Sequence, residues 1–422
     1  VYTWQEPDEK TLSFQREHSA SLRISIIVPA YRTKKEHLEA MLNSVSRQSY
    51  PHWELIVADA GGTAESVQAW AKKNGICLRK AADASNLAEW MDQSIMLCTL
   101  SENKGISANT NAGIELAAGD AVGLLDHDDL LTANALWEMA DCLEKEKKRG
   151  KQKLVLFSDE DKCDGAASRF YEPNFKPDFD GEMLLTNNYI CHFTVIETAF
   201  LKELKLRSGF DGAQDYDLML RAYAAGGQFV HVPKVLYHWR CHEASTASNP
   251  QSKRYAYEAG QRALEDYCLR KGWKATVSGL KHLGFYREDY EDSVFCQRPE
   301  IGIWAKPLPG GRDIFGIRHP KGFLVSGLYE NDGSMRYAGL RKGYSGPMHR
   351  AALQQSAPAA DLRSMEVCSA LKERYAQTIA ELKEACQGLP TAAQETKILQ
   401  KSMEFCKEAT AAGYGILWDP QA

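Results

Sequence analysis

Long apolar runs are missing from this 422-residue sequence, and none reaches the roughly 18–20 residues that cross a bilayer as a helix. The opening stretch, VYTWQEPDEK, contains acids and lacks an apolar segment, so we do not expect a signal peptide there. The eleven cysteines form no CxxC pair and no zinc-type spacing. This pattern predicts reduced thiols in a cytoplasmic protein, and it argues against a structural zinc site or a disulfide framework.

A strong excess of either charge is also absent. The formal net charge is −5, so the chain as a whole gives no reason to bind nucleic acid. Hydrophobic residues make up 44% and charged residues 25%, which is ordinary for a globular protein. A single core stops growing near roughly 250–300 residues, so this length predicts at least two domains. We expect a polar extension at residues 1–23, a first domain at 24–283, and a linker rich in Gly, Pro and Arg at the start of 284–422.

What the sequence does contain is an alternation of short β-branched runs with helical patterns, which predicts a parallel α/β sheet. Strands are expected at residues 24–28, 55–58, 121–125, 154–157, 229–232 and 235–239, and helices around 38–45, 66–73, 215–225, 255–272, 371–385 and 396–411, with a further helix ending at 114–118. Polar groups follow three of these strands, at Pro29 to Tyr31, at Asp59, and at Asp126 to Asp129. Since such sheets bind ligands outside the carboxyl ends of their strands, we expect these groups to meet in one crevice.

Asp126, Asp128 and Asp129 directly follow the third of these strands and form the first candidate site. Carboxylate oxygens suit Mg²⁺ or Mn²⁺, and one or two are enough where a diphosphate supplies further ligands. On an extended segment Asp126 and Asp128 point the same way, so they can share a target. The alternative is a solvated acidic turn, or a helix N-cap in which Asp129 precedes the run LLTANALWEMA.

The run Gln214-Asp215-Tyr216-Asp217 forms the second candidate site, at the start of an expected helix. At 3.6 residues per turn Asp215 and Asp217 lie about 200° apart, so only one of them can face the crevice. That carboxylate would remove a proton from an acceptor hydroxyl. The alternative is that both acids stabilise the helix N-terminus through capping and the helix dipole.

Two further polar runs follow expected strands. In the run HWRCH, His238 could ligate a metal, Arg240 could pair with a phosphate, and Trp239 could pack or stack on a sugar. A lone histidine is more often structural than a ligand. Asp159, Glu160 and Asp161 could contact the hydroxyl groups of a donor or acceptor sugar, or they could form a solvated turn.

Seven motifs in order carry a resemblance to a known family: ISIIVPAYRT, ELIVADAGGT, NKGISANTNAGIELAAGD, GLLDHDDLL, SDEDK, GAQDYDLMLR and VLYHWRCHEAST. This order resembles glycosyltransferase family 2, most of all its bacterial branch that builds O-antigen, rhamnan-type and other cell-surface polysaccharides. The resemblance covers roughly residues 24–275. It implies a GT-A fold, in which one Rossmann-like α/β domain holds a mixed sheet flanked by helices, and an inverting mechanism.

The resemblance also implies roles for single residues. Pro29, Tyr31 and Asp59 would hold the base and ribose of the donor, Asp126 would contact ribose or metal, Asp128 would be the direct metal ligand, Asp215 the catalytic base, and His238 a third metal ligand. Two positions depart from the family pattern. Ala60 stands where a second acid usually follows Asp59, and Gln214 stands where a Glu often precedes the base.

Taken together, the resemblance implies an inverting glycosyltransferase that uses Mn²⁺ or Mg²⁺. It would move a sugar from a nucleotide-sugar donor to a polysaccharide or lipid-linked acceptor in the cytoplasm, at the inner face of the membrane where the acceptor is lipid-linked. Residues 322–350 and 411–420 resemble pieces of a degenerate second transferase domain or accessory module, which would be α/β or mostly helical. The alternative is a non-catalytic scaffold that binds nucleotides or carbohydrate in a polysaccharide assembly complex. A nicotinamide dehydrogenase is disfavoured because no GxGxxG follows the first strand.

Overall fold

The computed structural model describes residues 2–81, 90–241, 254–279, 283–290, 301–305, 365–367, 369–385, 404–405, 408 and 415–418. The chain divides into two compact units. The larger comprises Val1–Phe179 with Asn188–Tyr267, and the smaller comprises Asp180–Asn187 with Cys268–Ala422. The stretch 322–350, most of 411–420 and most of the helix expected at 396–411 lie outside the described residues. The domain bounds inferred from the sequence therefore stay a prediction.

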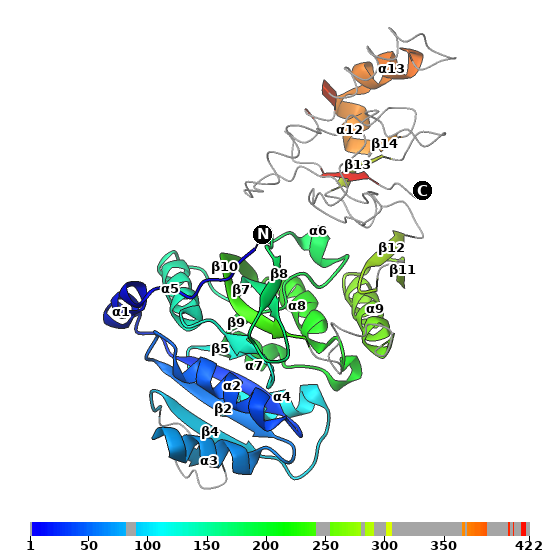
Figure 1. Cartoon of the computed structure of the whole chain (residues 1–422). Coiled ribbons are helices and arrows are strands. Elements are labelled where there is room, and N and C mark those ends of the chain that lie inside the picture. Colours follow the sequence, from blue (N-terminus) through cyan, green and yellow to red (C-terminus); the bar gives the residue numbers. More distant parts are fainter. Residues whose placement is uncertain are drawn as a thin grey trace. The chain divides into compact units, whose positions relative to one another are not determined.

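The larger unit is built on one mixed sheet with helices on both of its faces (Figure 1). The strands run in the order β3-β4-β2-β1-β5-β9-β7-β10-β6, and β8 pairs with β7 outside this path. Their bounds are β1 Ile24–Ala30, β2 Trp53–Asp59, β3 Cys77–Lys80, β4 Ser94–Thr99, β5 Ala121–Leu124, β6 Leu130–Leu131, β7 Leu154–Cys163, β8 Phe170–Asn174, β9 Thr194–Glu197 and β10 Gln228–Arg240. The helices are α1 Glu9–Glu17, α2 Lys35–Ser46, α3 Ala64–Asn74, α4 Ile106–Leu116, α5 Ala135–Lys148, α7 Thr198–Leu204, α8 Gln214–Ala224 and α9 Arg254–Arg270, with a short 3₁₀ turn at Ser208–Phe210.

Strands β2, β1 and β5 lie side by side and parallel at the centre of the sheet, which brings their carboxyl ends to one edge. Ala30 pairs with Asp59, and Ile27 pairs with Leu124. Strand β9 runs antiparallel to both β5 and β7, and this reversal makes the sheet mixed. The expected mixed α/β sheet flanked by helices is confirmed.

The side chains of β1 alternate between two apolar layers, as the period of a strand requires. Ile24, Ile26 and Val28 are fully buried in the cluster that includes Leu38 and Met41 of α2. Ile27 faces α4 on the opposite side, where a Cβ added at Gly113 would lie only 2.7 Å from the Ile27 Cγ2 atom. The absence of a side chain at Gly113 therefore lets α4 pack directly on β1.

Most expected elements are present with longer bounds, and the differences have local causes. Pro29 does not end the first strand, because it pairs with Ala58 inside β1. The strands expected at 229–232 and 235–239 form a single strand, β10, whose register against β7 shifts between Val232 and Val235. Pro233 lies in this shift and has no backbone N–H to offer the ladder. Strands β3, β4 and β9 and helix α1 were not predicted from the sequence.

The described parts of the smaller unit contain short elements. They are α6 Gly181–Leu184, β11 Ala275–Gly279, β12 Tyr286–Tyr290, β13 Ile301–Ala305, β14 Met365–Val367, α12 Ser369–Arg374, α13 Ala376–Ala385 and β15 Gly415–Trp418. Strands β11 and β12 form an antiparallel pair, and β13 lies between β14 and β15. The single helix expected at 371–385 is thus two helices, α12 and α13.

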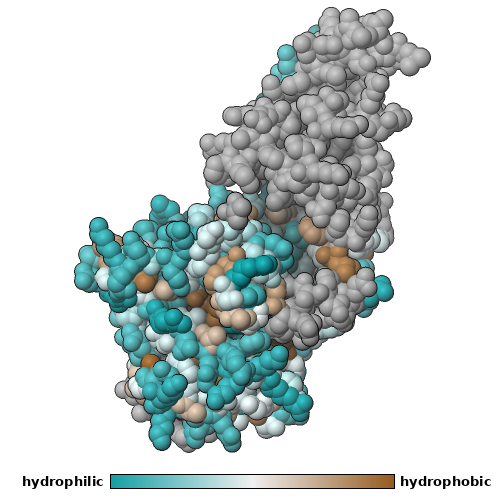
Figure 2. Space-filling view, viewed as in Figure 1, coloured by the Kyte–Doolittle hydropathy of each residue, from teal (hydrophilic) through white to brown (hydrophobic). Residues whose placement is uncertain are grey.

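Membrane-spanning helices and disulfides, which the sequence does not predict, can be checked in the described residues. Among them, no helix combines the length and the apolar character needed to cross a bilayer. The cysteines within the described ranges, among them Cys163 and Cys191, are all free thiols. Hydrophilic side chains cover most of the described surface in the view of Figure 2, where apolar residues gather only in small patches.

Candidate active site

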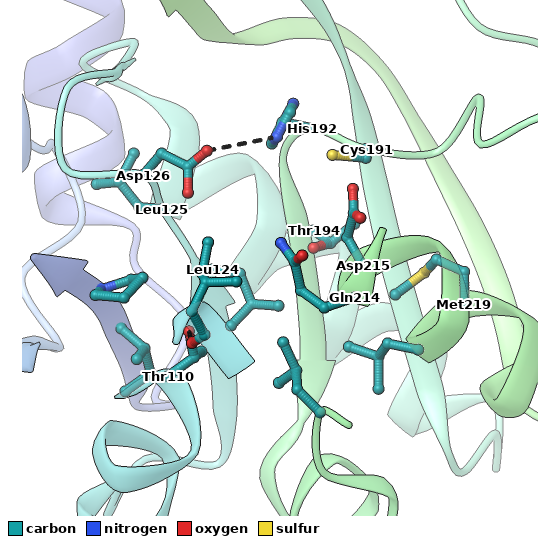
Figure 3. A pocket seen from close by; sticks show the side chains of 15 residues that line it. Thr110, Leu124, Leu125, Asp126, Cys191, His192, Thr194, Gln214, Asp215 and Met219 are labelled. Carbon is teal, nitrogen blue, oxygen red and sulfur yellow. Dashed lines mark hydrogen bonds and ion pairs between the residues drawn. The ribbon is translucent and has the colours of Figure 1, made fainter. Parts of the chain in front are cut away.

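A pocket lies at the carboxyl ends of β1 and β5, between these strands and the first turns of α4 and α8 (Figure 3). It encloses about 600 Å³, the space at its open side included. Apolar side chains from β1, α4 and α8 line much of it. The polar groups that converge there are Thr110, Asp126, His192, Thr194, Gln214 and Asp215. Ligand sites commonly combine apolar walls with a few converging polar groups in this way.

Helix α8 separates its two acids as its period requires. Asp215 lines the pocket, and its Oδ2 accepts a hydrogen bond of 2.9 Å from the Nδ2 of Asn188. Asp217 is buried instead, where it accepts hydrogen bonds from Arg207 and from the Nε of Arg221 at 2.9 Å. The helix N-cap is Ala213, which makes no side-chain capping bond. Of the two carboxylates, Asp215 is therefore the one placed to meet a ligand.

The acidic loop after β5 divides its carboxylates between the pocket and the protein interior. Asp126 lines the pocket, 3.9 Å from the Nε2 of His192. Asp129 is buried and accepts a hydrogen bond from the Tyr237 hydroxyl at 2.5 Å and one from the Arg240 backbone N–H at 2.7 Å. Burial, followed by the charges of the neighbouring Asp128 and Asp126, raises the pKa of Asp129 well above its usual range. Asp129 does not cap the next helix, because α5 begins at Ala135 after Asn134.

His238 and Arg240 lie on β10, on the face opposite to Tyr237 and Trp239. The His238 Nδ1 hydrogen-bonds Asp161, and its ring lies 5.0 Å from that of Trp4. Among the described residues, no group of three or more His, Cys, Asp or Glu side chains is arranged to hold a metal ion. The structure thus gives His238 a carboxylate partner away from the pocket and does not gather it with other ligands.

Arg240 ties β10 to the acidic loop. Its Nε donates to the Asp128 carbonyl oxygen at 2.5 Å, and its Nη1 donates to the Gly165 carbonyl oxygen at 2.7 Å. The Nη2 group is buried and has no hydrogen-bond partner among the described residues. Trp239 lies on the other face, with its ring 5.9 Å from that of His192. Arg240 therefore fixes the backbone at Asp128.

Asp159, Glu160 and Asp161 do not form a solvated turn, because they lie inside the ten-residue strand β7 and are buried. Each carboxylate has protein partners. Asp159 is bonded to His231 and to the Lys176 backbone N–H, Glu160 to His192 and Asn174, and Asp161 to Tyr2 and His238. These partners offset the cost of burying three acids in adjacent positions.

Two of the residues expected at the donor lie at the ends of β1 and β2. Asp59 is buried, and its carboxylate accepts hydrogen bonds from the backbone N–H groups of Gly61 at 3.0 Å and Ala64 at 2.9 Å, which fixes the turn into α3. Tyr31 is 41% exposed and lies against Gly61. Neither lines the pocket that holds Asp126 and Asp215. Of the three residues expected to hold base and ribose, only Pro29 lines this pocket.

The sequence reasoning missed three residues of the site that lie in the segment before β9: Cys191 and His192, which line the pocket, and Asn188, which lies behind Asp215 as its hydrogen-bond donor. The His192 Nδ1 lies 3.3 Å from the Glu160 Oε2, and its ring stacks on Tyr237 with centroids 4.8 Å apart. Burial alone would lower the pKa of His192, but the hydrogen bond with Glu160 and the charges of Glu160 and Asp126 raise it to about 9. At neutral pH His192 therefore brings a positive charge to the pocket. No periodic pattern marks this segment, so only the run of polar residues in TNNYICH could have pointed to it.

Comparison with known families identifies the domain that contains most of this site. Residues 25–204 match the model described as glycosyl transferase family 2. They form a glycosyltransferase family 2 domain. This domain therefore contains β1, which carries Pro29, and the two connecting segments that carry Asp126 and Asn188. Helix α8, which carries Asp215, follows the matched range.

The relatives of this chain include a protein that is named for O-antigen biosynthesis. The chain is 36% identical over 255 residues to the uncharacterized protein y4gI of Sinorhizobium fredii, covering 60% of this chain and 26% of that protein. It is 33% identical over 256 residues to the O-antigen biosynthesis protein RfbC of Myxococcus xanthus, covering 60% and 19%. The chain therefore spans about a quarter or less of the length of these two relatives. Among solved structures, S. aureus TarS 1-349 in complex with UDP-GlcNAc is similar at 20% identity and a TM-score of 0.43, over 59% of this chain and 67% of that one.

Proposed function

We propose that this chain is an inverting glycosyltransferase that moves a sugar from a nucleotide-sugar donor to a glycan or lipid-linked acceptor in cell-surface polysaccharide synthesis. One observation carries the proposal: Asp126, within the family 2 domain, and Asp215, just after it, line the same pocket although they are 89 positions apart in the sequence. The names of relatives such as RfbC support the polysaccharide context. Nucleotide sugars are cytoplasmic substrates, so we expect the reaction there.

Asp215 acts as the base in this proposal. It lies at the pocket wall, and Asn188 holds one of its oxygens. The acceptor oxygen attacks the anomeric carbon while its proton passes to Asp215, and the bond from that carbon to the diphosphate breaks. A single displacement of this kind inverts the anomeric configuration. His192, with its positive charge at the pocket, is placed to offset negative charge on a phosphate group.

The proposed donor site extends from this pocket toward the ends of β1 and β2. Asp126 would contact the ribose or the metal, with Pro29 beside it. Tyr31 and Asp59 stay predicted contacts of the base and ribose. For Asp59, a carboxylate oxygen that already accepts a hydrogen bond from the backbone would have to accept another one from the donor. Trp239 and Arg240 stay predicted contacts of the acceptor or a phosphate, as do the acids of β7.

The acidic loop fits a divalent ion that is shared with the donor. Asp126, Asp128 and Asp129 crowd negative charge into four residues, and this crowding adds to the effect of burial on the pKa of Asp129. Hard oxygen ligands of this kind suit Mn²⁺ or Mg²⁺. When bound, the ion would neutralise charge on the leaving diphosphate. We assign Asp128 as the protein ligand and leave His238 out of the set, because His238 does not line the pocket that holds Asp126 and Asp215.

A screen of melting temperatures tests donor binding. UDP-glucose, UDP-N-acetylglucosamine, dTDP-rhamnose and GDP-mannose would each be added with Mn²⁺. A ligand at 100 times its Kd stabilises the folded state by about 2.7 kcal/mol, which raises the Tm of a domain this size by roughly 5 °C. We expect such a rise with at least one donor, followed by slow donor hydrolysis. Binding without any turnover would favour the scaffold alternative, and no shift with any donor would contradict both.

Asp128→Ala should remove the dependence of donor binding on the metal. Without this carboxylate the ion loses its protein ligand, so the extra Tm shift that Mn²⁺ gives to the bound donor should disappear. The matched control is Asp141→Ala on α5, whose carboxylate pairs with Lys145 at the surface. The control should keep the full shift. An Asp128→Ala protein that keeps it too would show that the metal, if used, is held elsewhere.

A further inference from the structure

We propose that Asn188 is a positioning residue, which holds the carboxylate of Asp215 in place for its role as the base. The inference rests on the proposed function, because it takes Asp215 as the base in sugar transfer. Nothing in the sequence pattern singles out Asn188, and its place beside Asp215 is a matter of tertiary structure. It lies between α6 and β9, 27 residues before its partner.

The orientation of the Asn188 amide follows from the charge of its partner. Its Nδ2 lies 2.9 Å from the Asp215 Oδ2. An ionised carboxylate only accepts hydrogen bonds, so the amide must present its NH₂ group there and its oxygen elsewhere. A hydrogen bond to a charged group is stronger than one between neutral groups. Asn188 therefore holds the Asp215 side chain in one rotamer.

The other half of the amide provides the second observation. The Oδ1 of Asn188 is buried and has no hydrogen-bond partner among the described residues. Buried polar atoms without a partner are rare and cost free energy, so we infer that the amide is kept for the hydrogen bond that its Nδ2 donates to Asp215. Asn188 does not line the pocket, so it acts on a ligand only through Asp215.

Cys191 completes the surroundings of the base. Figure 3 shows its sulfur beside the Asp215 carboxylate, on the side of the pocket where His192 lies. Burial, followed by the negative charge of Asp215, raises the pKa of Cys191 well above its usual range. The thiol thus stays protonated and can only add a weak hydrogen bond to Asp215. The strong donor that fixes the carboxylate is the Asn188 amide.

In the reaction, these groups act on one nucleophile. The acceptor hydroxyl forms a bond to the anomeric carbon, its proton passes to Asp215, and the nucleoside diphosphate leaves with the bonding electrons. When water replaces the acceptor, one of its protons passes to Asp215, which Asn188 holds in place. Hydrolysis of the donor therefore reports on Asn188 even before the natural acceptor is identified.

The test is the steady-state hydrolysis of the donor panel above, with Mn²⁺, for wild type, Asn188→Ala and Asn188→Asp. For Asn188→Ala we expect kcat to fall about 10- to 100-fold while KM for the donor stays within twofold, since a misplaced base slows the chemical step and not binding. Asn188→Asp keeps the shape but places a second carboxylate beside Asp215. Like charges this close share a proton, so the acidic limb of its pH–rate profile should move to higher pH by more than one unit.

The matched control is Asn43→Ala on α2, a half-buried asparagine whose Oδ1 accepts from the Trp70 indole at 3.2 Å. Its Tm is expected to fall as for Asn188→Ala, but its kcat and pH–rate profile should stay those of wild type. If wild type hydrolyses a donor and both Asn188 variants behave like Asn43→Ala, this inference is overturned and the proposed function stands. If wild type hydrolyses none of the donors, the proposed function fails and this inference fails with it.

Discussion

Asp215→Asn is expected to slow sugar transfer by about 10²- to 10⁴-fold, the range that a positioned general base contributes. The amide has nearly the shape of the carboxylate but cannot take the acceptor proton. Donor binding should stay close to that of wild type, because the lost interaction belongs to the transition state. Initial rates of nucleotide release and donor-induced Tm shifts, measured on the same preparations, check both halves of this expectation.

The outcome that contradicts the assignment of Asp215 is turnover close to that of wild type. A parallel loss of donor binding and of stability would be a different result, since it would give Asp215 a structural role. The structure argues against that role, because the hydrogen bond that the Asp215 carboxylate accepts from the Asn188 side chain could be accepted equally by an amide oxygen. Asp215→Asn should therefore melt within a few degrees of wild type.

Asp217→Ala should lower the stability and leave turnover intact, which is the opposite of the effect expected for Asp215→Asn, although the two acids are only two residues apart. Asp217 is 1% exposed and joins Arg207 to Arg221. Removing it leaves two guanidinium groups without their shared carboxylate. Breaking a buried pair costs about 3–5 kcal/mol, and because the Arg207 side chain is 27% exposed we expect about 3 kcal/mol here. Urea unfolding should show this loss, together with a fall in Tm of roughly 6–12 °C.

Asp217→Asn serves as the control for Asp217→Ala, because it keeps the volume and one hydrogen-bond acceptor while removing the charge. Its loss of stability should be smaller. At temperatures where the variants stay folded, both should bind the donor and turn it over at rates near that of wild type. A stable Asp217→Ala protein that has lost activity would reverse the assignment of the two carboxylates on α8.

The sequence predicts those parts of the fold that have a local signal. The apolar runs of β1, β2, β5 and β7 were recognisable because strands buried on both faces are continuously hydrophobic. The split between Asp215 and Asp217 followed from the helical period alone. Strand β9 could not be foreseen as antiparallel, since its direction depends on how β5 and β7 are connected around it.

The candidate site was predictable only where its residues follow a strand or begin a helix. Asp126 and Asp215 meet these conditions, whereas Asn188 and His192 lie in an irregular segment whose place is set by tertiary contacts. For the acids of β7, the alternative of a solvated turn was wrong because it ended the strand before them, whereas β7 runs from Leu154 to Cys163. They are buried because His231 and His238 reach them from β10, which is more than 70 residues away in the sequence.

A proton NMR time course of the donor panel with Mn²⁺ tests the account most directly, because it reports donor consumption and the configuration of the sugar together. We predict that at least one nucleotide sugar is consumed by the wild-type protein and that the first-formed product carries the opposite anomeric configuration to the donor. A product that retains the donor configuration would contradict a single displacement assisted by Asp215. A panel that remains intact would contradict the assignment of the pocket as a site of sugar transfer.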